Sequence, residues 1–139
     1  MALEVRSVTK RFGDVVANSA VDVVVEPGAL HAVLGENGAG KSTLMKILSG
    51  FQPADSGEVL LDGAPLVLGS ARAAVEAGVG MLHQDPLVVL PFTVLENFLF
   101  GRRLGRKAGR SLPADISQRL GFVLDTDPPT ASLSVGEPP

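Results

Sequence analysis

Hydrophobic and polar positions near the start of the chain follow the two-residue period of β-strands. Leu3, Val5 and Val8 alternate with polar residues, which predicts a first strand. Val21 to Val25 is rich in β-branched residues and is closed by a Pro-Gly pair, so it predicts a second strand followed by a turn. Glu58 to Leu61 predicts a further strand and ends in an Asp-Gly turn.

Two short apolar runs predict buried strands. Ala29 to Leu34 leads directly into a glycine-rich loop, and Val79 to Leu82 follows a glycine that ends a helix. Three segments have helical periodicity and end signals: residues 41–49, residues 70–77 with a serine N-cap, and Val94 to Phe100 with Thr93 and Glu96 at capping-box spacing. Strands that alternate with helices predict an α/β sheet.

The pattern changes after Gly101. Residues 102–110 carry five basic side chains and two glycines, which predicts an exposed loop; contact with lipid headgroups or a membrane partner is the alternative. A short helix is expected from Pro113 to Val123, with proline in its first turn. The loop of residues 125–130 follows, and its two aspartates, next to two prolines, read as turn residues rather than a catalytic pair.

Composition narrows the function classes. The 139 residues are 45% hydrophobic, enough for a core, and form one domain or part of a larger one. The net charge of −3 gives no general attraction to nucleic acid. With no cysteine and only two histidines, thiol chemistry and a histidine-based metal site are excluded. No apolar run is long enough to span a bilayer, so a soluble intracellular protein is expected, with any membrane association made through a partner.

One segment fits the eight-position phosphate-loop pattern without a mismatch: Gly35, Glu36, Asn37, Gly38, Ala39, Gly40, Lys41 and Ser42. The glycines allow a tight turn in which successive N–H groups face phosphate oxygens, and the following helix adds the positive end of its dipole. We expect Lys41 to reach the β- and γ-phosphates of ATP and the Ser42 hydroxyl to bind Mg²⁺, with Thr43 beside it. A chance glycine-rich turn is the alternative, but a predicted strand precedes the loop and a helix follows it.

Three further segments, together with the loop, resemble the ATP-binding subunits of ABC transporters. Residues 10–13 contain Phe12, where the family places an aromatic that stacks on adenine. Residues 81–86 contain Gln84, at the position that contacts Mg²⁺ or the attacking water and senses the membrane partner. Leu133 to Glu137 resembles the signature, in which Ser134 and Gly136 would contact ATP held by the opposite subunit.

The resemblance implies a fold, partners and a location. The fold is an α/β phosphate-loop ATPase core with an N-terminal antiparallel β portion over residues 1–100, and the start of a helical subdomain over residues 101–139. The partners are membrane permease subunits, a second ATP-binding subunit in a sandwich dimer and a solute-binding protein, at the cytoplasmic face of the membrane. Val135 and the segments around Gln84 and Thr93 look most like importers of sugars and nucleosides.

The resemblance also implies catalytic residues beyond the signature, namely an Asp for Mg²⁺, a Glu that activates water and a later His. We therefore expect residues 1–139 to be an incomplete domain, from a truncation, a frameshift or a partial gene, that binds nucleotide without hydrolysing it and folds poorly. Ala29 to Leu34 would lack its neighbouring strands.

Several residues have plainer alternatives. Phe12 is alternatively a packing residue and Gln84 an ordinary loop residue. His31 reads as a hydrogen-bonded structural residue and His83 as a loop residue. Three functions compete: the ATPase of an importer, a nucleotide-binding module without turnover, and a soluble ABC protein of translation or DNA repair. Val135 and the low basic charge argue against the last.

Overall fold

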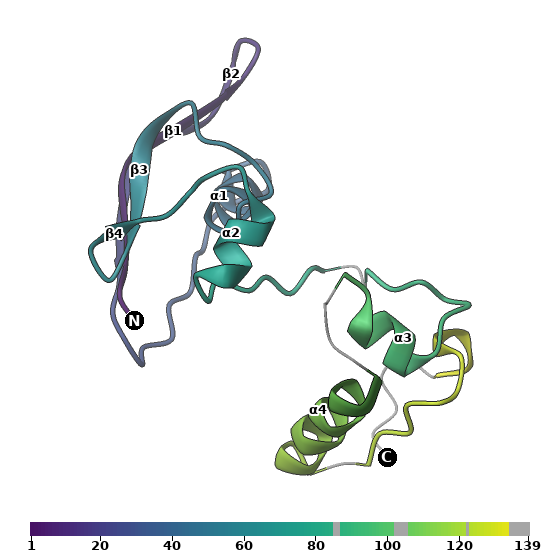
Figure 1. The fold of residues 1–139 in the computed structure, drawn as a ribbon. Coiled ribbons are helices and arrows are strands. Elements are labelled where there is room, and N and C mark those ends of the chain that lie inside the picture. Colours follow the sequence, from purple (N-terminus) through teal and green to yellow (C-terminus); the bar gives the residue numbers. More distant parts are fainter. Residues whose placement is uncertain (85–86, 102–105, 122, 134–139) are drawn as a thin grey trace. The chain divides into compact units, whose positions relative to one another are not determined.

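The chain folds as two compact units, Met1–Leu82 and His83–Pro139. The structure is a computed structural model that describes residues 1–84, 87–101, 106–121 and 123–133 (Figure 1).

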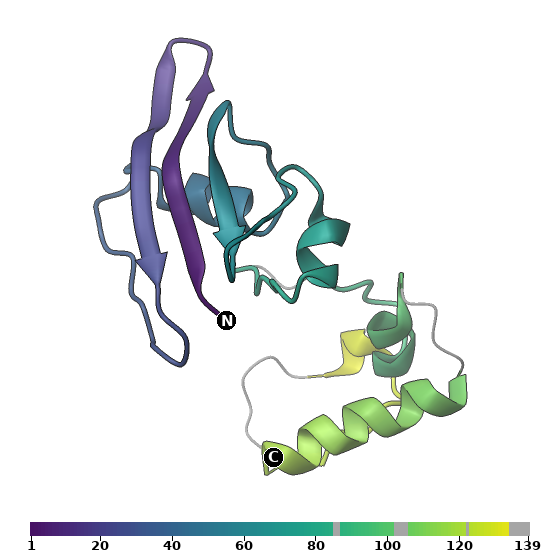
Figure 2. The same cartoon turned by 60° about the vertical axis from the view of Figure 1, so that its left-hand side comes forward.

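The first unit is built on a four-stranded antiparallel sheet of order β2-β1-β3-β4. Its strands are β1 (Leu3–Phe12), β2 (Val15–Val25), β3 (Ser56–Leu61) and β4 (Ala64–Pro65). In Figure 2, β2, β1 and β3 lie side by side, with helix α1 (Lys41–Leu48) behind them. The three strands predicted for this sheet, β1, β2 and β3, are confirmed, and β2 begins six residues earlier than the β-branched run suggested.

The core lies between one face of the sheet and α1. Val5, Val8 and Val59 point inward and are buried, and Leu44 and Ile47 of α1 close over them. Strand side chains alternate between faces, and the register shift between Val5 and Val8 brings both valines to the core face although they are three residues apart.

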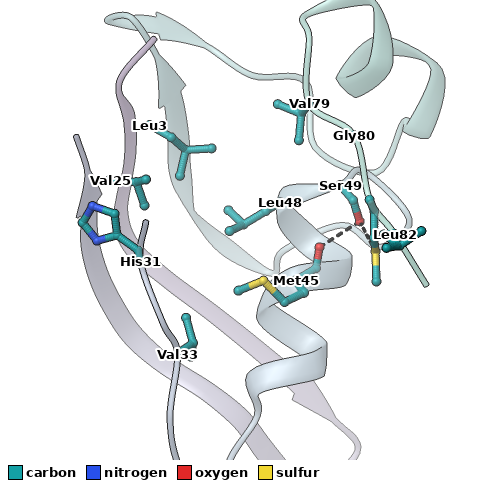
Figure 3. Close-up of a pocket in the computed structure, with 11 residues that line it drawn as sticks. Leu3, Val25, His31, Val33, Met45, Leu48, Ser49, Val79, Gly80 and Leu82 are labelled. Carbon is teal, nitrogen blue, oxygen red and sulfur yellow. Dashed lines mark hydrogen bonds between the residues drawn. The ribbon is translucent and has the colours of Figure 1, made fainter. Parts of the chain in front are cut away.

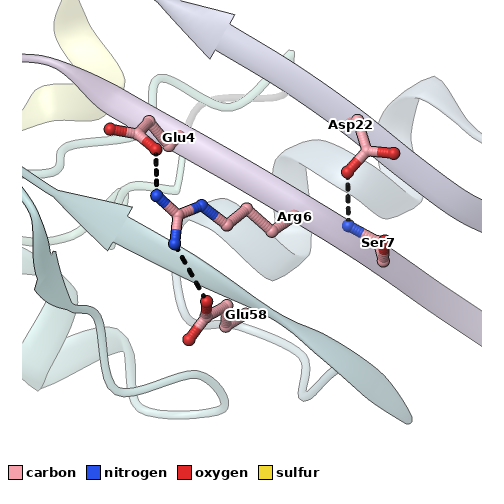
Figure 4. Close-up of polar contacts among 5 residues, drawn as sticks. All are labelled: Glu4, Arg6, Ser7, Asp22 and Glu58. Atoms are coloured by element: carbon pink, nitrogen blue, oxygen red, sulfur yellow. Dashed lines mark hydrogen bonds and ion pairs between the residues drawn. The ribbon is translucent and has the colours of Figure 1, made fainter.

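The opposite face of the sheet is polar. The Arg6 guanidinium bridges carboxylates on its own strand and the next, at 2.6 Å from Glu4 and 3.4 Å from Glu58 (Figure 4). The Ser7 N–H donates to Asp22 Oδ1 at 2.7 Å. Ser7 has a φ of 48° and lies where the β1 register shifts, so the Asp22 carboxylate satisfies a donor at this β-bulge.

The predicted helix start signals are confirmed. Helix α2 (Ala71–Glu76) is capped by Ser70, whose hydroxyl accepts from the Ala73 N–H. Helix α3 (Val94–Leu99), in the second unit, begins with the complete capping box of Thr93 and Glu96. A single 3₁₀ turn, η1, covers Thr130–Ser132.

Asn97 organises the second unit. Its side-chain nitrogen donates to the Val89 carbonyl at 2.9 Å and to Thr130 Oγ1 at 2.8 Å, and its oxygen accepts from the Val89 N–H at 2.7 Å. One amide therefore joins α3, the loop before it and a residue 33 positions later in the sequence.

The strands predicted for residues 29–34 and 79–82 are wrong. Both segments lack strand pairing, and Leu30 and Leu82 are fully exposed. A strand needs a hydrogen-bonded neighbour on at least one side, and within the described residues neither segment has one. In these two segments, an apolar run alone is therefore not enough to form a strand.

These two segments instead border an apolar groove of about 420 Å³ in the first unit. Figure 3 shows Leu3 and Val25 of the sheet, Met45 and Leu48 of α1, and Val33 around it. The Ser49 hydroxyl, at its edge, donates to the Met45 carbonyl at 2.8 Å.

The exposed loop predicted for residues 102–110 is also wrong from Arg106 onward. Helix α4 spans Arg106–Arg119, so the helix expected from Pro113 begins seven residues earlier and keeps that proline inside it. Arg, Lys and Ala are strong helix formers, and basic charge with glycine was a poor reason to assign a loop. Among the described residues, no helix has the length and apolarity that crossing a membrane requires.

Candidate functional site

The glycine-rich loop delivers the chain into the N-terminus of α1. Gly38 and Gly40 adopt left-handed conformations, with φ of 87° and 81°. Gly40 is the N-cap of α1, no side chain caps the helix, and its first turn holds no acidic residue. The first N–H groups of the helix are therefore not engaged by a capping side chain, and the positive end of the dipole faces the loop.

Lys41 folds back over the loop. Its ammonium donates to the carbonyls of Gly35 and Glu36, both at 2.7 Å. These contacts hold a positive charge beside the N–H groups of the turn. A phosphate could replace these two carbonyls, because its oxygens are negatively charged and pair more strongly with an ammonium than neutral carbonyl oxygens do.

Ser42 and Thr43 occupy the first turn of α1, Ser42 exposed and Thr43 half-buried. In the described part of the chain, neither hydroxyl has a protein partner. Mg²⁺ prefers oxygen ligands and keeps several waters, taking one or two protein groups together with phosphate oxygens. The free Ser42 hydroxyl fits that donor set. Glu36, Asn37 and Ala39 complete the loop and are exposed.

The end of the loop is pressed against β2. A methyl group on Gly40 would lie 2.1 Å from the Ala17 carbonyl oxygen. The Asn18 side-chain nitrogen donates to the Gly40 carbonyl at 3.3 Å. Asn18, which the sequence pattern did not single out, is buried within β2. The strand also holds the polar residues Ser19 and Asp22, so polarity alone gave no signal for it.

Phe12 lies at the end of β1, opposite Val15 in the hairpin, with 46% of its surface exposed. The Lys10 ammonium lies 5.7 Å from the centre of its ring. Lys10 also donates to Asp55 at 2.7 Å, and this bond, together with the Arg11 N–H, lowers the pKa of Asp55. The Phe12 ring therefore contacts the Lys10 ammonium and keeps part of its surface exposed to solvent.

The remaining predicted residues are Gln84, His83 and His31, together with two that lie outside the described residues. Gln84 is exposed and belongs to the second unit. Ser134 and Gly136 lie outside the described residues. His83 is half-buried. His31 accepts a hydrogen bond from the Glu26 N–H at 3.3 Å, which confirms a structural hydrogen bond, although on an exposed segment and not in a strand.

A family model described as ABC transporter matches residues 19–138. The chain belongs to the ABC transporter family. It is 41% identical, over 97% of its length, to a ribose import ATP-binding protein of Streptomyces coelicolor, and 40% identical to a nucleoside import ATP-binding protein of Lactococcus lactis. It spans 28% of the length of each of these relatives.

Solved ABC structures share the fold. A nucleotide-free ATP-binding cassette from an ABC transporter superimposes with a TM-score of 0.77 at 25% identity, over 96% of this chain and 60% of that one. The cbiO1 protein of Clostridium perfringens, part of an ABC transporter complex, gives 0.74 at 26% identity, over 95% of this chain and 55% of that one. The predicted fold class is thereby confirmed.

The Gly40 contact makes a testable prediction. Gly38→Ala and Gly40→Ala both force alanine into a left-handed conformation, which costs about 1–2 kcal/mol, but a methyl at Gly38 meets nothing within 4 Å. Gly40→Ala must also displace β2 backbone, at about 1–3 kcal/mol more. Urea unfolding followed by circular dichroism measures both losses. Equal losses would show that the approach of the loop to β2 is not tight.

Proposed function

We propose that residues 35–43 bind the phosphates of Mg-ATP, and that this chain is the ATP-binding part of an ABC importer. The observation that carries the proposal is the uncapped N-terminus of α1, entered through two left-handed glycines and covered by the Lys41 ammonium. Backbone N–H groups, a helix dipole and the Lys41 cation together form an anion site.

In this proposal the phosphates take the place of the Gly35 and Glu36 carbonyls as partners of Lys41. The loop N–H groups then donate to the β-phosphate, while Lys41 bridges to the γ-phosphate. Bound Mg²⁺ would neutralise further phosphate charge, and the Ser42 hydroxyl is the group on the loop that would hold it. Gln84 is its proposed second ligand.

Phe12 supplies the proposed adenine platform. Its ring is half exposed at the end of the same hairpin whose second strand packs against Gly40. Stacking needs only an open aromatic face, and the Lys10 contact restricts how the ring can turn.

The proposed physiological role is uptake of a sugar or nucleoside, supported by the names of the ribose and nucleoside import relatives. Permease subunits, a second ATP-binding subunit and a solute-binding protein would be the partners, at the cytoplasmic face of the membrane. Ser134 and Gly136 would contact ATP of the opposite subunit. Residues 1–100 are assigned to the ATPase core and 101–139 to the start of the helical subdomain.

Binding without turnover is the second candidate. The resemblance assigns activation of the attacking water to a Glu that follows the signature. Gln84 is a poor substitute, because an amide does not accept a proton as a carboxylate does. Phosphate release separates the two candidates: steady turnover that Lys41→Ala abolishes supports the ATPase, and binding without release supports the module.

Lys41→Ala should weaken Mg-ATP binding about ten- to a hundredfold. The change removes a charge-assisted interaction, which is worth about 1.5–3 kcal/mol. Titration with a fluorescent ATP analogue measures the affinity. Lys46→Ala, on an exposed position of the same helix, is the matched control and should bind as the wild type does. Unchanged affinity in Lys41→Ala would contradict the site.

Phe12→Leu should weaken ATP binding and leave inorganic triphosphate binding unchanged. Leucine keeps apolar bulk at the end of β1 but loses the flat ring, and stacking is worth roughly 1–3 kcal/mol per base. Phe12→Tyr keeps the ring and serves as the control. Competition titrations compare the two ligands, and an equal loss for both would mean that Phe12 supports the fold alone.

A further inference from the structure

Asn18 is a buried amide whose hydrogen bonding is incomplete. It is 7% exposed within β2, and its nitrogen donates to the Gly40 carbonyl at 3.3 Å. Its oxygen is fully buried and has no hydrogen-bond partner. Among the described residues, no other buried side-chain oxygen or nitrogen atom lacks one. An unpaired buried carbonyl opposes folding.

The orientation of the amide is fixed by its neighbour. Only the NH₂ group can face the Gly40 carbonyl, so the oxygen must point to the other side. The Gly40 carbonyl already accepts from the Leu44 N–H at 2.9 Å, and its second lone pair takes the Asn18 bond. Asn18 thus shares the oxygen that starts the α1 hydrogen-bond ladder.

The consequence falls on Lys41. The Gly40 carbonyl and the Lys41 N–H belong to one peptide group, which is planar and trans, so the two bonds point in opposite directions. A side chain that holds the carbonyl toward β2 also holds the N–H away from it. That N–H is one of the donors at the uncapped end of α1.

We propose that Asn18 is a positioning residue of the phosphate loop, whose amide holds the Gly40 carbonyl and thereby directs the Lys41 N–H at the bound phosphate. The inference rests on the proposed phosphate site. It adds a link between that site and the hairpin that carries Phe12. It also explains why an amide occupies a position where an apolar side chain would leave no unpaired oxygen.

The test separates polarity from volume. Asn18→Leu and Asn18→Ala both remove the donor, but leucine fills the site, whereas alanine leaves a void that destabilises. Leucine also removes the unpaired oxygen, so its thermal midpoint should equal or exceed that of the wild type, and that of alanine should fall. Both variants should bind inorganic triphosphate with Mg²⁺ about fivefold more weakly, the change that one ordinary net hydrogen bond represents. Ser19→Ala, an exposed neighbour, is the control.

Each result supports or overturns the inference. An equal loss of affinity in both variants, with a thermal midpoint at or above that of the wild type for leucine and below it for alanine, supports a positioning role. Affinity that follows the midpoint, or leucine and alanine variants that bind as tightly as the wild type, overturns it and leaves the proposed site intact. If either variant fails to fold, the other still decides by its affinity. A wild-type chain that binds no triphosphate overturns the proposed function itself.

Discussion

The close contact between Gly40 and the backbone of β2 is the constraint on which the site depends. Among the described residues, no paired strand supports the loop on its entry side, since residues 29–34 are irregular and exposed. Its exit side is held by the Ala17 carbonyl, which a single methyl group on Gly40 would overlap, and by the Asn18 amide. The position of the phosphate loop is therefore fixed by its contact with β2 of the sheet and by α1, which packs on the core.

The apolar residues of the first unit form two contrasting regions, a closed core and an open groove. Val5, Val8, Ile47 and Val59 form a dry contact between the sheet and α1, and burial of such side chains contributes about 1.5–3 kcal/mol each. Next to this core, and lined in part by Met45 and Leu48 of the same helix, the groove bordered by residues 29–34 and 79–82 is open and apolar. Local opening should begin at these unpaired segments, where few backbone hydrogen bonds resist it.

Local signals allowed much of the structure to be predicted. The strand at residue 3, the Ser70 cap and the capping box of Thr93 and Glu96 depend on neighbours in sequence, and all three are confirmed. The strand predictions for residues 29–34 and 79–82 were wrong, because strand pairing is non-local and an apolar run does not supply its own partner. The loop prediction for residues 106–110 was wrong, because helix propensity outweighed charge and glycine content. The phosphate-loop motif could be recognised from the sequence. The role proposed for Asn18 could not, because it depends on the burial of this residue against Gly40 in the fold.

The most direct test of the phosphate site is a map of amide shifts on the 139-residue chain. Two-dimensional ¹H–¹⁵N spectra would be recorded with and without Mg-ATP, and again with inorganic triphosphate. Binding in the loop predicts the largest shifts at Gly38, Gly40, Lys41 and Ser42 with both ligands, because their N–H groups lie in the loop and at the start of α1. Shifts that bypass the loop and gather in the second unit, or none at saturating ligand, would contradict it.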